Sequence, residues 1–103
     1  AAAVLVCGDL DRAFPPAPDF WVIDAAIAAQ NMTLAANDLG IGSVWLGTWP
    51  DEKRVKRQAA IFQLPETIVP HSILALGYPA EDIDMRAVRP SRYEENRVHV
   101  NQW

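Results

Sequence analysis

The 103-residue sequence predicts a domain that combines one long apolar helix with several short strands. Over residues 21–39 the apolar side chains cover most of the circumference of a helix, leaving a narrow polar stripe at Gln30, Thr33 and Asn37. Short apolar runs at residues 1–6, 41–46 and 72–77 are each followed closely by glycine or proline, as buried strands often are. These patterns favour a single domain built from both helices and strands.

The composition excludes several classes of protein. Half of the residues are hydrophobic and 21% are charged, which is typical of a globular chain. A net charge of -4 argues against a nucleic-acid-binding protein, which normally has a basic face. No apolar run approaches the roughly 20 residues that a membrane helix needs. Cys7 is the only cysteine and cannot form an internal disulfide, so we expect a reducing cytoplasm.

The long helix has predicted boundaries at residues 19 and 39. Three prolines within residues 14–18 predict a loop, and Asp19 is the predicted N-cap. Gly40 is expected to end the helix in a left-handed conformation. A helix this apolar should be buried on nearly all sides, so we expect it to pack against a partner subunit or a missing half of the domain. The chain also begins without methionine and directly in a strand, which suggests a fragment of a larger domain.

The second half of the chain contains further elements. Asp51 is a predicted N-cap for a helix over residues 52–62, and residues 97–100 alternate like an edge strand. Four basic residues on that helix could bind phosphate or a partner, but a solvated helix face is the favoured interpretation. They are Lys53, Arg54, Lys56 and Arg57.

Familiar catalytic patterns are missing. The glycines at 40, 42 and 47 follow a helix instead of opening one, so they do not form a dinucleotide fingerprint. His71, His99 and Cys7 lack the spacing of metal ligands, and Ser43 with His71 lacks the context of a nucleophile elbow. No catalytic side chain and no metal site are therefore predicted.

Two features remain. A glycine-bearing turn exposes backbone amides beside Trp45, and a separate Arg-Pro-Ser-Arg loop carries Arg89 and Arg92. Glycine allows close approach of the backbone to a flat ligand, and two guanidinium groups suit a phosphate. Each feature alone has an ordinary explanation, as a helix stop beside a core tryptophan and as a solvated turn. Their combination favours a phosphorylated planar cofactor.

Four segments resemble the FMN-dependent nitroreductase family. Trp21 with residues 24–36 is similar to its long central helix, and residues 39–47 (LGIGSVWLG) to the turn and strand that follow. Residues 74–79 (LALGYP) resemble the end of a family strand, and residues 89–103 its basic loop and C-terminal extension. The chain matches the C-terminal half of the family's domain.

The resemblance implies an α+β fold of three layers, α/β/α, with a mixed sheet. It implies an intertwined homodimer formed through the long helix and the C-terminal tail, with FMN at the interface. Trp45, Leu46 and Gly47 would lie beside the isoalloxazine ring, largely through backbone groups, and Arg89 and Arg92 would reach the FMN phosphate. The implied activity is hydride transfer from NAD(P)H through FMN to a nitroaromatic, a quinone or a similar small-molecule acceptor.

Two alternatives remain open at this point. The chain could be a non-catalytic dimerisation or regulatory module that lacks FMN. It could also belong to a flavoenzyme of the same fold with other chemistry, such as reductive dehalogenation or flavin breakdown.

Overall fold

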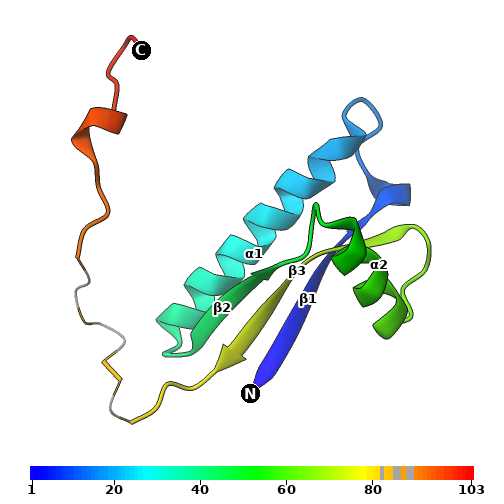
Figure 1. Cartoon of the computed structure of the whole chain (residues 1–103), viewed down its shortest axis with the longest axis horizontal. Helices are drawn as coiled ribbons and strands as arrows, with labels where there is room; N and C mark the ends of the chain where they lie inside the picture. The colour runs from blue at the N-terminus through cyan, green and yellow to red at the C-terminus, as the bar shows by residue number, and fades with distance from the viewer. Residues whose placement is uncertain (82, 85–86, 88–89) are drawn as a thin grey trace.

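A computed structural model describes residues 1–81, 83–84, 87 and 90–103 of the chain (Figure 1). Three strands and two α-helices make up the body of the molecule: β1 (Ala2–Asp9), α1 (Trp21–Asp38), β2 (Gly42–Gly47), α2 (Glu52–Ile61) and β3 (Ile68–Gly77). Short 3-10 turns at Leu10–Arg12, Pro18–Phe20 and Glu95–Arg97 complete the described elements. No helix in the described ranges is both long and apolar enough to cross a membrane.

The three strands form a sheet in the order β1-β3-β2. Both pairings are antiparallel, whereas the resemblance implies a mixed sheet. Strand β3 comes last in the chain, lies between the other two strands and runs antiparallel to both. Strand β2 therefore forms one edge of the sheet in the described part of the chain.

The two helices lie on opposite faces of this sheet. Leu74 is fully buried in a cluster with Trp21, Ala25 and Ala29 of α1. Its neighbour Ile73 lines a small pocket with residues of α2. Successive side chains of a strand point to opposite faces, so the α+β class and the three-layer arrangement are both confirmed.

Helix α1 begins two residues after the predicted N-cap. Pro18–Phe20 form a 3-10 turn, Phe20 occupies the N-cap position, and no side chain caps the helix there. The prediction for Asp19 is therefore wrong: the proline turn carries the chain into the helix without a polar cap. The predicted stop is confirmed, because Gly40 has φ +72° and Ile41 N donates to Ala36 O at 2.8 Å.

One face of α1 packs against the sheet. Its buried residues are Trp21, Ala25, Ala29 and Ala36, and the small alanines let the helix approach the strands closely. Three other apolar residues of the helix are more than half exposed in this chain: Ile23, Ile27 and Leu34. Helix α1 is therefore not buried on all sides here. The helix thus offers a large uncovered apolar surface.

A β-bulge interrupts the pairing of β1 with β3. Val6 pairs with Ser72 and Cys7 with Pro70, so His71 is an extra residue in β3. Pro70 lies beside this irregularity, which is where a strand tolerates a residue without a backbone N–H. The bulge shifts the alternation of side chains along β3 and brings His71 to the same face as Trp21.

Residues 90–103 stand apart from the sheet (Figure 1). Their side chains are all exposed. The edge strand expected at residues 97–100 is not present. A 3-10 turn at Glu95–Arg97 begins this region instead, and Arg97 Nε pairs locally with Glu94 Oε2 at 2.7 Å. Alternation alone does not make a strand without a neighbouring strand to pair with.

Candidate functional site

The turn over residues 47–51, called the Gly47 turn below, links β2 to α2. Thr48 N and Trp49 N both donate to the carbonyl oxygen of His71, at 3.1 and 3.0 Å. Asp51 N donates to Thr48 O at 3.0 Å and closes the turn. The bulge in β3 therefore holds the backbone of the Gly47 turn from the sheet side.

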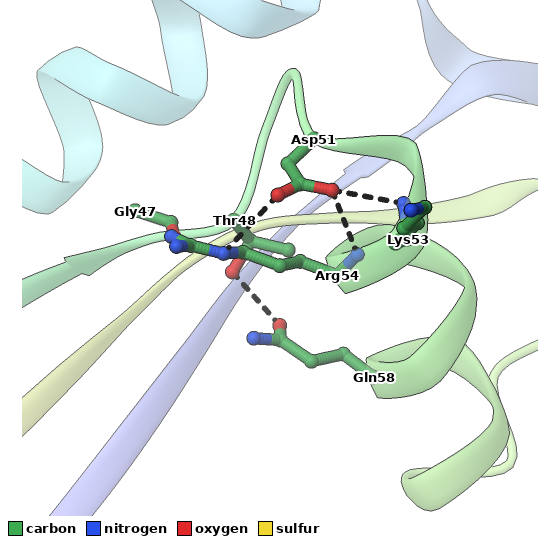
Figure 2. Close-up of polar contacts among 6 residues, drawn as sticks. All are labelled: Gly47, Thr48, Asp51, Lys53, Arg54 and Gln58. Atoms are coloured by element: carbon green, nitrogen blue, oxygen red, sulfur yellow. Dashed lines mark hydrogen bonds and ion pairs between the residues drawn. The ribbon is translucent and has the colours of Figure 1, made fainter.

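Helix α2 holds the same turn from the other side (Figure 2). The predicted N-cap is confirmed, since Asp51 Oδ1 accepts from Lys53 N at 3.0 Å and from Arg54 N at 3.2 Å. Arg54 Nη1 reaches back to donate to Gly47 O at 3.0 Å, and its Nε pairs with Asp51 Oδ2 at 3.3 Å. The other basic residues of α2, Lys53, Lys56 and Arg57, are exposed, as expected of the solvated helix face that the sequence favours.

Thr48 anchors the centre of the turn. It is 1% exposed, and its hydroxyl donates to Gln58 Oε1 of α2 at 2.9 Å. A buried hydroxyl with a partner stabilises its surroundings, whereas the same group without one would be strongly unfavourable. The turn is thus fixed through its backbone and through its one buried polar side chain.

Aromatic rings surround His71 on the α1 face. The ring centroid of His71 lies 6.1 Å from those of Trp21 and Trp45, and Trp21 lies 5.2 Å from Trp49, edge to face. Burial lowers the pKa of His71 below its ordinary value of 6.5, which favours a neutral imidazole at pH 7. Its Nδ1 lies 3.1 Å from Ser72 Oγ, within hydrogen-bonding distance.

The predicted contact residues lie at the edge of the sheet. Trp45 pairs with Leu74 and Leu46 with Ile73, so their side chains point to opposite faces. A single flat ligand could therefore meet both residues only along the backbone edge of β2, and their contact with a cofactor stays a prediction. Trp45 is 37% exposed, and a Cβ built on Gly47 would meet no atom within 4 Å.

The two predicted phosphate-binding residues lie elsewhere. Arg89 lies outside the described residues. Arg92 is exposed in the segment that stands apart from the sheet, so this chain alone does not bring it to the Gly47 turn. The role of both arginines stays a prediction.

The Gly47 turn leaves room for a planar group. A Cβ on Gly47 would meet no atom within 4 Å, and β2 is an edge strand of the sheet in the described part of the chain. The guanidinium of Arg92 has the charge to pair with a phosphate. In the described ranges no group of three or more His, Cys, Asp or Glu residues could hold a metal ion.

The roles of three residues at this turn were not predicted: Arg54, Gln58 and His71. Their roles depend on contacts across the fold, because Arg54 must reach back seven residues and His71 acts through its backbone carbonyl. The only sequence signal was Asp51, whose capping position begins α2 and so places Arg54 beside the turn.

Comparisons with known proteins agree with the family resemblance. A family model described as the nitroreductase family matches residues 2–78. A Methanothermobacter thermautotrophicus protein, provisionally named an NADH dehydrogenase/NAD(P)H nitroreductase, is 41% identical over 101 residues. The match covers 98% of this chain and 50% of that protein, so the chain spans about half the length of this relative.

Solved structures show the same relation. An FMN-dependent nitroreductase from Clostridium difficile is 26% identical, with a TM-score of 0.78, and the match covers 98% of this chain and 57% of that one. A nitroreductase with bound FMN from Bacteroides fragilis is 27% identical, with a TM-score of 0.64, and the match covers 97% and 50%. The fold of this chain corresponds to the C-terminal half of such structures.

Proposed function

Because this chain belongs to the nitroreductase family, we propose that the complete natural protein carrying it is an FMN-dependent NAD(P)H oxidoreductase. When bound, FMN would supply the redox chemistry, accepting hydride from NAD(P)H and passing it to a nitroaromatic, a quinone or a similar small acceptor. The observation that carries this proposal is the open space beside Gly47, at the sheet edge that β2 forms in the described part of the chain.

The chain's own residues would bind and orient the cofactor. The backbone of Leu46 and Gly47 would lie along the ring, with Trp45 beside it, and Arg92 together with Arg89 would pair with the phosphate. Glycine at 47 matters because a side chain there would stand between the backbone and the ring. No acid or base side chain is required of this half of the site.

A homodimer is part of the proposal. The uncovered apolar residues of α1 would bury against a second copy, and residues 90–103 would reach across to it. Exposed apolar surface of this extent normally marks an interaction site. A reducing cytoplasm is the proposed location, in agreement with the free Cys7.

Substitution of Gly47 tests the site. Gly47→Ala places a methyl group where the chain has open space and does not need a left-handed backbone, so it should fold normally. We expect FMN affinity to fall about tenfold or more, because about 1.4 kcal/mol of lost binding energy corresponds to tenfold. Gly77→Ala is the matched control, since a Cβ there also meets no atom within 4 Å.

The outcomes separate the candidate functions. Loss of affinity in Gly47→Ala, with Gly77→Ala unchanged, supports FMN at the Gly47 turn. Equal affinity in both variants would place the cofactor elsewhere. A folded natural protein that takes up no FMN would instead favour the non-catalytic dimerisation module.

A further inference from the structure

One peptide group of the Gly47 turn is held at both of its polar ends. Its oxygen, the carbonyl of Gly47, accepts from Arg54 Nη1 at 3.0 Å. Its N–H, that of Thr48, donates to His71 O at 3.1 Å. Glycine allows a wide range of backbone angles, so this peptide could otherwise rotate between orientations. The two hydrogen bonds fix its plane.

The arginine that holds the oxygen is itself held in place. Asp51 Oδ2 lies 3.3 Å from Arg54 Nε, and Asp51 Oδ1 accepts from Arg54 N (Figure 2). The guanidinium therefore presents Nη1 to Gly47 while its Nε remains paired with the cap of its own helix. Planar guanidinium groups lose little freedom for each additional hydrogen bond in such an arrangement.

The ion pair between Arg54 and Asp51 is too exposed to contribute much to the stability of the fold. The side chain of Arg54 is 65% exposed and that of Asp51 is 48% exposed, and exposed ion pairs contribute little to folding. The Arg54–Gly47 hydrogen bond does, however, hold the oxygen end of the peptide at the proposed cofactor edge. A charged donor also makes this hydrogen bond stronger than a neutral one.

We propose that Arg54 is a positioning residue that orients the Gly47–Thr48 peptide for the cofactor. The proposal rests on the proposed function of the Gly47 turn and deepens it. Arg54 does not touch the cofactor; it acts through the Gly47 carbonyl. By fixing the peptide before binding, it lowers the ordering that binding would otherwise require.

The test compares Arg54→Ala with Lys53→Ala in the complete natural protein. Both variants remove one positive charge from the first turn of α2. Lys53 contributes only its backbone N–H to the cap, which alanine keeps, and its side chain makes no hydrogen bond or ion pair in the described part of the chain. Arg54→Lys keeps the charge but loses the planar guanidinium, and should fall between Arg54→Ala and the wild type.

Two readouts are needed. Amide hydrogen exchange of Thr48, measured without FMN, should be faster in Arg54→Ala than in Lys53→Ala, at similar melting temperatures. FMN affinity should fall about tenfold in Arg54→Ala alone, because binding would then have to order a peptide that Arg54 otherwise holds in place.

Each failure has a separate meaning. If Arg54→Ala matches Lys53→Ala in both readouts, the positioning role is wrong. If exchange rises without a change in FMN affinity, Arg54 holds the turn but does not serve the cofactor, and the proposal is also overturned. If the wild-type protein binds no FMN, the proposed function itself fails, while the exchange data still show whether Arg54 holds the peptide.

Discussion

The indole ring of Trp21 lies directly against the α-carbon of Gly8, so that a Cβ on Gly8 would overlap the ring at Cε3 and Cδ2. This contact joins the first turn of α1 to β1. It also places Trp21 beside Trp49 of the Gly47 turn. A core position and the candidate site therefore share one side chain.

Gly8→Ala should destabilise the protein by about 1–3 kcal/mol, because the added methyl group forces the ring or the strand to move. Urea unfolding of the variant and of the wild type measures the change. Gly77→Ala, where a Cβ meets open space, is the control. Equal loss of stability in the two variants would contradict the close packing of Trp21 on β1.

Asp51→Ala should destabilise the protein by about 1 kcal/mol, the usual cost of losing an N-cap side chain. Glu52→Ala is the neighbouring control, because the ion pair of Glu52 with Lys56 spans 3.4 Å between largely exposed side chains and contributes little. Thermal unfolding compares the two. A larger loss for Glu52→Ala would show that the cap is not the main contact at this helix start.

His71 should make stability depend on pH. Because its pKa is lowered in the folded state, the unfolded chain binds a proton first as the pH falls through about 6.5. The free energy of unfolding should therefore decrease below this pH and level off once the folded state is protonated too. His71→Asn should show a smaller decrease between pH 7.5 and 5.5, measured by urea unfolding. An identical decrease would assign the effect to other groups.

Arg92→Ala should weaken FMN retention and reduce its sensitivity to salt, because a guanidinium–phosphate pair is screened by ions. Arg97→Ala is a suitable control, since Arg97 is also exposed but already pairs with Glu94. Fluorescence titration with FMN at low and high salt measures both effects. Unchanged FMN affinity in Arg92→Ala would remove Arg92 from the site.

Local sequence signals predicted much of the fold. The apolar run of α1, the stop at Gly40 and the cap at Asp51 depend on nearby residues, and the structure confirms them. The predicted cap at Asp19 was wrong because the proline turn beside it supplies a different entry into the helix.

Features that depend on distant contacts could not be predicted. Strand β3 begins at Ile68 instead of residue 72, since its first residues pair with the end of β1 across the bulge. The alternating residues 97–100 have no neighbouring strand in the described structure. The Arg54 contact with Gly47 O needs the geometry of the whole turn, which no spacing of charges reveals.

Binding of FMN by the complete natural protein tests the central claim most directly. The protein would be incubated with FMN, separated by gel filtration and examined by visible absorption, alongside Gly47→Ala. We predict a retained flavin band near one FMN per subunit that NAD(P)H bleaches, and clear loss of the band in the variant. A colourless, folded wild-type protein would contradict the claim that the Gly47 turn belongs to a flavin site.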